Sequence, residues 1–314
     1  MKEVVLTKPP YMNASEQRIA DMHTVLNIIN ILIGELSLTE TEVPELSERS
    51  KELDAELHAI ARAIKEGGEL ARIMPRIRDS EAAVLAHLRE ALEQEESASS
   101  RAEIKASISN LESIFAIFKK RLNELEFRMD DPDVWGQIAP DVFRQQFEDV
   151  FAAIAKNSKG DYGIHFNLNQ KGQGDYYIDL KVEAQLDGGQ LWMPLRLIDV
   201  LRDLTANARK YTEPGGQVAL VVNQDESGIR AVVEDSGCGI PDDEIEKVTE
   251  FGYRASNVRK RPTLGGGFGL TKAAWLVTTW GGRLTIRSEV DQGTTIKLFI
   301  PNKPMPSNPP VFKL

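Results

Sequence analysis

Apolar residues in the first 130 positions recur at helical spacing and define two long amphipathic segments. In the first, they stand at Ile19, Met22, Leu26, Ile29, Ile33 and Leu36. In the second, they stand at Ile104, Ile108, Leu111, Phe115, Phe118, Leu122 and Leu125. This spacing lays one apolar seam along each helix. Because neither helix can bury its own seam, we expect the two to pack in a bundle, and we predict a homodimer through this helical half.

Weaker helical patterns lie between the two seams, at about residues 43–66 and 79–97. Gly67, Gly68 and Pro75 separate them, as residues that interrupt helices do. Their faces are rich in charge and carry few large apolar side chains. We therefore expect these two helices to form the outer part of the bundle.

The pattern changes after residues 130–133, which read DDPD. A helix near 140–157 is followed by alternating stretches typical of strands, at residues 164–168, 176–182, 218–223, 229–234, 283–288 and 294–300. Helices near 194–211 and 269–280 interleave with them. The order predicts an α+β chain, with a helical domain over residues 1–130 and a mixed sheet, covered by helices on one face, over residues 131–302. We expect the proline-rich tail, 303–314, to be ordered only when something binds it.

Composition narrows the classes of function. The chain has 314 residues and a net charge of −10, which argues against a protein that binds nucleic acid by neutralising phosphates. Its single cysteine, Cys238, excludes an intramolecular disulfide and a cysteine-rich metal site. Residues 25–36 form the most apolar run, but two asparagines interrupt it and it is too short to span a bilayer. With no signal-peptide pattern at the N-terminus, we expect a cytoplasmic protein that is not inserted in a membrane. A membrane signal would reach it through a separate sensor protein.

Residues 201–212 read LRDLTANARKYT and fall on a predicted helix. Asp203, Asn207 and Lys210 stand at positions i, i+4 and i+7, so their polar groups share one face. A carboxamide on that face can ligate Mg²⁺ while a lysine meets phosphate oxygens. A solvated helix face is the alternative interpretation.

Residues 233–241 read VEDSGCGIP, where a predicted strand ends at Asp235. A carboxylate at a strand end can accept a hydrogen bond from the exocyclic amine of adenine. Gly237 and Gly239 permit close approach of the backbone to a flat ligand. An ordinary turn is the alternative, and the D-x-G-x-G-I-P run makes it the weaker one.

Residues 264–270 read LGGGFGL and lead into a helix. Gly265, Gly267 and Gly269 supply backbone amides at a helix N-terminus, which is a ready site for an anion. Glycine runs also serve as hinges. The segment lacks the lysine of a P-loop and does not lie in a βαβ unit, so neither a Walker nor a Rossmann site fits.

In this order and spacing, the three segments resemble the N box and the two glycine boxes of the ATP-binding domain shared by gyrase, the large heat-shock chaperones, histidine kinases and mismatch-repair ATPases. The Lys-Tyr-Thr sequence ending at Thr212, the Gly-Gly pair at 281–282 and Gly293-Thr294 look specifically like histidine kinases. The resemblance covers about residues 140–301. It implies an α/β sandwich that binds Mg-ATP.

The resemblance also implies roles for individual residues. Asn207 would ligate Mg²⁺, Lys210 would contact phosphate, Tyr211 would lie beside the base and Asp235 would read adenine. Residues 251–256 look like the family's phenylalanine box, and residues 252–266 would form the lid over ATP. The nucleotide would also contact lid and glycine-box residues, namely Arg254, Arg259, Lys260, Arg261, Gly237, Gly239, Gly265, Gly267, Gly269 and Leu270.

Two residues depart from the family's pattern in this region. Leu264 stands where the second glycine box has its first glycine, which would stiffen the lid. Asp203 stands where kinases commonly have asparagine and where the hydrolysing relatives have a glutamate that orients water.

In histidine kinases a helical hairpin upstream of the ATP-binding domain carries the phosphoacceptor. Residues 23–30 resemble the family's H box at His23, Asn27 and Asn30, which share one face beside the first seam. Thr24 stands where the family has an acidic residue that accepts the Nδ1 proton of the histidine, and Ile28 replaces the usual proline.

The resemblance implies that Mg-ATP phosphorylates His23 and that an aspartate on a response regulator receiver domain receives the phosphoryl group. Asn27 would orient a water in the reverse reaction, the dephosphorylation of the regulator. Two alternatives remain open from the sequence. One is a nucleotide-binding scaffold or degenerate kinase that regulates a partner by contact, and the other is an ATP-hydrolysing switch that uses Asp203.

Overall fold

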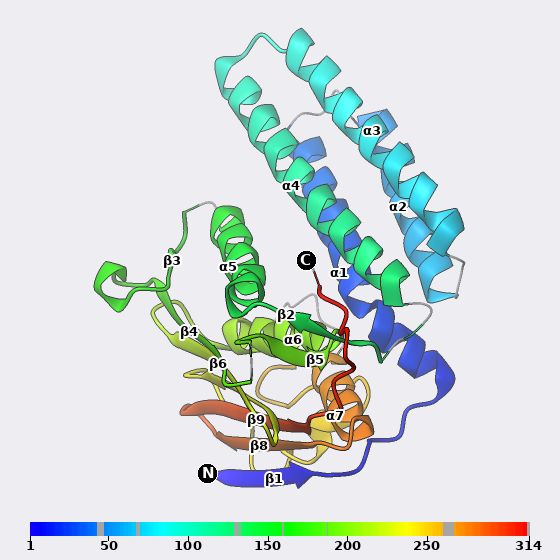
Figure 1. Ribbon diagram of the computed structural model, residues 1–314. Coiled ribbons are helices and arrows are strands. Elements are labelled where there is room, and N and C mark those ends of the chain that lie inside the picture. Colours follow the sequence, from blue (N-terminus) through cyan, green and yellow to red (C-terminus); the bar gives the residue numbers. More distant parts are fainter. Residues whose placement is uncertain are drawn as a thin grey trace. The chain divides into compact units, whose positions relative to one another are not determined.

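The computed structural model describes residues 1–42, 47–66, 70–128, 131, 133–158, 160–186, 188–259 and 267–312. The chain folds into two compact units (Figure 1). One consists of Ala14–Asp131 and is helical, and the other combines Met1–Asn13 with Pro132–Leu314. The helical domain was predicted to begin at residue 1. In the structure, the first 13 residues belong instead to the second unit.

Four long helices form the helical unit: α1 (Ala14–Glu42), α2 (Ser47–Lys65), α3 (Leu70–Gln94) and α4 (Ala98–Arg128). α1 packs against α2 and α4, and α3 packs against the same two helices, so the bundle closes within one chain. Leu26, Ile29 and Leu36 of the first seam are buried in one cluster with Leu111, Phe115 and Phe118 of the second. The predicted packing of the two seams is confirmed.

α2 and α3 contribute as much to this core as the two long seams. Leu57, Ile60, Ile77, Val84 and Leu88 are all at most 1% exposed. The expectation that these helices form only the outer part of the bundle is wrong, because a few aliphatic residues at helical spacing suffice to bury one face. Pro75 does not separate helices either. It lies in the second turn of α3, where a missing N–H costs one backbone hydrogen bond.

The second unit is built on a seven-stranded sheet in the order β1-β8-β9-β7-β6-β4-β3. Its strands are β1 (Lys2–Leu6), β3 (Ile164–His165), β4 (Tyr176–Ala184), β6 (Gln217–Asp225), β7 (Gly228–Asp235), β8 (Arg283–Glu289) and β9 (Gly293–Pro301). β4 runs parallel to both β3 and β6, and the other neighbours are antiparallel. The predicted mixed sheet is confirmed.

Helices α5 (Pro140–Asn157), α6 (Leu197–Tyr211) and α7 (Gly269–Thr279) lie on the same side of the sheet (Figure 1). Their apolar faces and the facing sheet residues form one core, in which Phe143, Phe147 and Phe151 of α5 stand one turn apart. A separate two-stranded sheet pairs β2 (Trp135–Ile138) with β5 (Leu191–Pro194). Short 3-10 turns occur at Leu168–Gln170 and Lys247–Thr249. In the described parts of the chain, no helix has both the length and the apolar character needed to cross a membrane.

β1 was not predicted from the sequence. It pairs antiparallel with β8, with Lys2 opposite Ser288 and Leu6 opposite Leu284. The chain therefore begins at an edge of the sheet, leaves this unit after Asn13 and returns to it after the helical unit.

The proline-rich tail packs on β2. The amide of Gln137 donates to the carbonyl of Pro310 at 2.7 Å, and the amide of Phe312 donates to the carbonyl of Gln137 at 2.8 Å. Phe312 is buried against Gly136, where any larger side chain would overlap its ring. Up to residue 312 the tail is thus ordered by its own chain, contrary to the expectation that it needs a bound partner.

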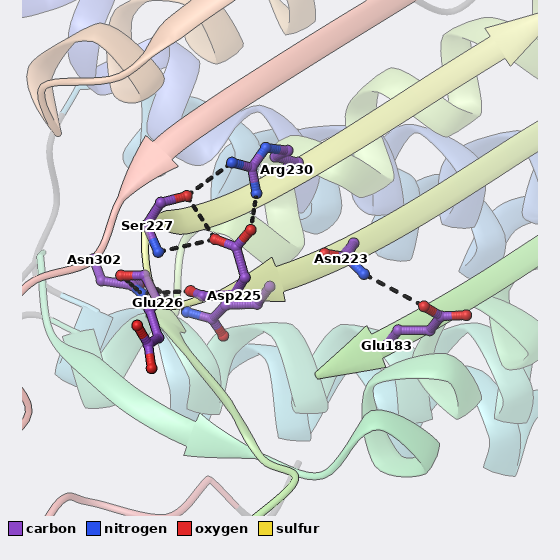
Figure 2. A network of polar contacts seen from close by, with 8 residues as sticks. Glu183, Asn223, Asp225, Glu226, Ser227, Arg230 and Asn302 are labelled. Atoms are coloured by element: carbon purple, nitrogen blue, oxygen red, sulfur yellow. Dashed lines mark hydrogen bonds and ion pairs between the residues drawn. The ribbon is translucent and has the colours of Figure 1, made fainter. Parts of the chain in front are cut away.

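Figure 2 shows how the hairpin between β6 and β7 is closed. The Asp225 carboxylate accepts hydrogen bonds from the amide and hydroxyl of Ser227, and it forms an ion pair with Arg230 at 2.7 Å. These contacts lower the pKa of Asp225 to about 2. Asn302 donates to the carbonyls of Asp225 and Glu226. The network fixes the end of β7 opposite to Asp235.

Candidate functional site

One face of α6 carries three of the predicted residues. The helix buries Leu197, Val200, Leu201 and Leu204 in the core, and Asp203, Asn207 and Lys210 lie on another, partly exposed face. Burial, together with the positive charge of Arg254, lowers the pKa of Lys210. Two cations that repel each other in this way favour an anionic ligand between them. Arg254 therefore lies near enough to Lys210 to act on its charge.

Asp235 is the last residue of β7 and stands opposite Thr294 of β9. Its carboxylate accepts the amide of Gly237 at 2.9 Å. Burial raises the pKa of Asp235 to about 6, although hydrogen bonds from the amides of Gly237 and Thr294 act in the opposite direction. A half-buried carboxylate of this kind is a strong acceptor for a hydrogen-bond donor on a ligand.

The loop after Asp235 packs against the end of α6. The amide of Cys238 donates to the carbonyl of Tyr211 at 3.1 Å, which holds Tyr211 beside this loop. A β-carbon at Gly237 would collide with the same carbonyl, and one at Gly239, whose φ is +64°, would overlap the carbonyl of Glu289. Both glycines are therefore required by backbone packing, a reason that differs from the expected approach to a ligand.

The second glycine segment places the N-terminus of α7 against α6. Gly267 has a φ of +75°, and a β-carbon there would lie 2.8 Å from the carbonyl oxygen of Tyr253. Gly269 begins α7, where a β-carbon would lie 3.2 Å from Nδ2 of Asn207. Leu270, the next residue, is half-buried against the core. The predicted residues Gly265, Lys260, Arg261 and Leu264 lie outside the described residues.

Described residues on both sides of 260–266 are well anchored. Phe251 stacks on Phe268 with ring centroids 4.4 Å apart. The buried carboxylate of Glu244 accepts the amide of Ser256 at 2.7 Å and its hydroxyl at 3.1 Å. Arg254 donates to the carbonyl of Val258 at 3.0 Å, and Arg259 lies over the ring of Tyr253. Sequence reasoning missed Glu244, because a glutamate in the run PDDEIEK looks like any solvated charge.

Lys272 was also missed. It lies on α7, is 2% exposed, and its Nζ stands 3.1 Å from Oδ2 of Asp203, whose side chain is 12% exposed. Its spacing offered a signal, because Lys272 follows Gly269 by three residues and so shares the helix face that abuts α6. The partner could not be inferred, since it lies 69 positions earlier in the chain.

His23 and Asn27 belong to α1, in the helical unit, whereas the other candidates belong to the second unit. The side chains of His23, Thr24 and Asn27 lie outside the described part of the structure. Among their neighbours on α1, Leu26 and Ile29 are buried and Asn30 is exposed.

Residues 193–304 match the model of the family of histidine kinase-, DNA gyrase B- and HSP90-like ATPases. The predicted ATP-binding domain is thus confirmed over these residues, and the match implies ATP as the nucleotide. The sensor protein SrrB of Staphylococcus aureus (strain NCTC 8325 / PS 47) is 31% identical over 106 residues, which are 34% of this chain and 18% of SrrB. The chain thus matches less than a fifth of the length of that curated relative.

Two solved structures are similar at lower identity. The mycobacterial sensor histidine kinase MprB is 23% identical, with a TM-score of 0.36 over 52% of this chain and 95% of that one. Full-length ShkA in complex with AMPPNP is 20% identical, with a TM-score of 0.44 over 75% of this chain and 46% of that one.

Proposed function

We propose that this protein is a histidine kinase of a two-component pathway. Mg-ATP phosphorylates His23, and an aspartate on the receiver domain of a response regulator then accepts the phosphoryl group. The observation that carries the proposal is the match of residues 193–304 to the ATPase family, because Asp203, Asn207, Lys210, Asp235 and Gly269 all lie within that range.

Nucleotide binding follows from the charges of the site. The half-buried carboxylate of Asp235 accepts the exocyclic amine of adenine, and Tyr211, held beside the same loop, lies against the base. Lys210 and Arg254, which repel each other in the free protein, meet the phosphates. Phosphoryl transfer depends mainly on positioning and charge neutralisation, which two convergent cations supply.

Asn207 is the proposed ligand of Mg²⁺. Its carboxamide lies against the N-terminus of α7, where Gly269 leaves room that a side chain would fill. An amide oxygen is a suitable ligand for Mg²⁺, which takes its remaining ligands from water and from substrate phosphates. When bound, the ion neutralises charge on the phosphates. Asn207 would orient that complex, and the N-terminus of α7, a suitable place for an anion, lies next to the Asn207 carboxamide.

His23 is the proposed nucleophile. Helical spacing places Asn30 and Gly34 seven and eleven residues after His23 on one stripe of α1, and both are exposed. Such a stripe is open to a second unit and to a receiver domain. Asn27, one turn after His23, is the proposed residue for dephosphorylation of the regulator. With Thr24 in place of an acidic neighbour, Nδ1 of the imidazole has a weaker acceptor and autophosphorylation is slow.

The proposed partners are a response regulator, a separate sensor protein and a second copy of this chain, without nucleic acid, and the proposed location of the chain itself is the cytoplasm. Most described residues of the two seams are already buried within one chain, so a dimer through residues 14–128 uses the outer surface of the bundle. Ile31, a large apolar residue of α1 that is 42% exposed, lies on that surface. Sedimentation velocity over a range of concentrations tests the dimer, and a monomer at every concentration would contradict it.

The competing hydrolytic switch is disfavoured by the ion pair of Asp203. The buried ammonium of Lys272 donates to Oδ2 of Asp203, so one of the two oxygens of this carboxylate is held in an ion pair and the orientation of the carboxylate is fixed. The kinase proposal and its two alternatives give different products from γ-labelled ATP. A kinase gives labelled protein, a scaffold gives no turnover, and a switch gives free phosphate.

The direct experiment incubates the full chain with γ-labelled ATP and Mg²⁺. We expect an acid-labile, base-stable phosphoprotein, and His23→Gln should remove the label without altering ATP affinity. His87→Gln, a histidine of α3 in the same bundle, is the matched control and should keep the label. Label that persists in His23→Gln would place the acceptor elsewhere.

A further inference from the structure

A buried ion pair joins α6 to α7 one turn of α6 before Asn207, the proposed ligand of Mg²⁺. Nζ of Lys272 lies 3.1 Å from Oδ2 of Asp203, and the two side chains are only 2% and 12% exposed. The neighbours of Lys272 on α7 are apolar and buried, among them Ala273, Leu276 and Val277. A lysine in such surroundings needs a counter-charge, and among the described residues Asp203 is its one ion-pair partner.

The pair stands next to the residues proposed to bind Mg-ATP. Asp203 precedes Asn207 by one turn of α6. A β-carbon built at Gly269 would lie 3.5 Å from Cβ of Asp203 and 3.2 Å from Nδ2 of Asn207. Asp203, Asn207 and Gly269 therefore lie together at the N-terminus of α7.

A carboxylate at this position has a specific chemical consequence. If the ion pair did not fix its orientation, the Asp203 carboxylate could take a proton from a water molecule as that water attacks the γ-phosphorus of ATP. A bond would form from the water oxygen to phosphorus, the bond from phosphorus to the β–γ bridging oxygen would break, and ADP and phosphate would leave. General-base assistance of this kind is worth about 10²–10⁴-fold in rate. A kinase would then lose to water the phosphoryl group that its histidine must receive.

We propose that Lys272 is a positioning residue: its ion pair with Oδ2 fixes the orientation of the Asp203 carboxylate, so that the carboxylate does not act as a base on water. The ion pair thereby limits hydrolysis, and the γ-phosphoryl group of ATP stays available for transfer to His23. This inference rests on the proposed kinase function for its purpose, but the effect on hydrolysis follows from the ion pair alone. Lys272 acts through Asp203, because its own side chain is only 2% exposed.

The test measures release of free phosphate from γ-labelled ATP by the full chain. Lys272→Met replaces the ammonium with an apolar group of similar length. We expect kcat for phosphate release to rise by about tenfold or more, within the range of general-base assistance, with KM for ATP little changed. Lys272→Arg keeps the cation and should stay at the native level. Lys272→Met combined with Asp203→Asn removes both charges and should also return to that level.

An ion pair with only a structural role would not give this pattern, because loss of packing raises KM for ATP, lowers kcat, or does both. Lys272→Gln keeps a hydrogen-bond donor and serves where Lys272→Met fails to fold, with a smaller rise expected. Unchanged phosphate release in a variant that binds ATP normally would overturn the inference. So would a double variant that releases phosphate as fast as Lys272→Met, since the base would then not be Asp203. Absence of labelled protein in every variant, with phosphate release rising as expected, would count against the kinase proposal and leave this inference standing.

Discussion

The helical unit and the ATP-binding unit follow their sequence patterns in different ways. In the bundle, residues such as Leu57, Phe115 and Phe118 recur at helical spacing, and each serves only to fill the core. In the other unit, the candidate residues stand where periodicity stops, as Asp235 does at the end of β7 and Gly269 at the start of α7. The comparison teaches that periodicity predicts the framework, whereas interruptions of it mark the chemistry.

Charge is placed differently in the two units as well. Ion pairs of the bundle, such as Arg89–Glu112 and Arg76–Glu56, have exposed partners and contribute little to stability. The second unit buries Asp203–Lys272 and also Asp199–Arg202 on α6. Breaking a buried pair is costly, because it leaves an unpaired charge in the interior. The buried pairs therefore hold the side chains of α6 in fixed positions.

The largest expected effect is a loss of stability that is confined to the helical unit. Phe115→Ala empties a fully buried position in the bundle core and should destabilise the helical unit by about 3–5 kcal/mol. Hydrogen exchange should show lost protection in α1–α4, while ATP affinity and protection of β6 and β7 stay native. The exposed α4 variant Lys105→Ala is the control, with a change below about 0.5 kcal/mol. Equal loss of protection in both units would contradict their description as separate cores.

A second variant affects only the ATP-binding unit. Asn207→Ala removes the proposed Mg²⁺ ligand and should abolish the part of the ATP affinity that depends on Mg²⁺, without unfolding the protein. Calorimetry with and without Mg²⁺ measures this difference. Asn223→Ala is a matched loss of a carboxamide near the β6–β7 turn, at the end of the hairpin opposite to Asp235, and should bind normally. Native Mg²⁺ dependence in Asn207→Ala would remove that residue from the site.

The smallest expected effect concerns pH. Since the pKa of Asp235 is raised to about 6, its carboxylate is ionised above that pH and accepts the adenine amine. ATP affinity should fall as pH drops through about 6, by at most about tenfold per unit. The phosphates of ATP also titrate, so Asp235→Asn is the reference: it should bind more weakly at pH 8 and show a flatter profile. The free energy of unfolding of the free protein changes in the opposite direction. It rises as pH drops through about 6, because protonation of Asp235 removes a buried charge. Parallel profiles for the two proteins would contradict the assignment.

The sequence predicted most of the framework. Strands β4, β6, β7, β8 and β9 and helices α5, α6 and α7 follow long alternating or helical patterns, and the structure contains all of them. The sequence did not predict β2 and β5, because each has four residues with no alternation, and the run LWMP of β5 is buried throughout. β1 escaped because its five residues are paired with a strand near the other end of the chain.

The candidate site was predictable only where residues stand close in sequence. Asp203, Asn207 and Lys210 share a helix face, and helical geometry brought them together in advance. The Asp203–Lys272 pair and the contact of Gly239 with Glu289 depend on how distant segments pack. No local pattern encodes such contacts.

The central claim is that the ATP-binding unit phosphorylates His23 on the other unit. Its most direct test is the time course of label from γ-labelled ATP into the native chain and into Thr24→Glu, with ATP affinity measured on both. A glutamate at position 24 gives Nδ1 of the imidazole the acceptor that threonine supplies poorly, and general-base assistance is worth about 10²–10⁴-fold. We predict slow labelling of the native chain and clearly faster labelling of Thr24→Glu. No label in either protein, with ATP still bound by both, would contradict the account.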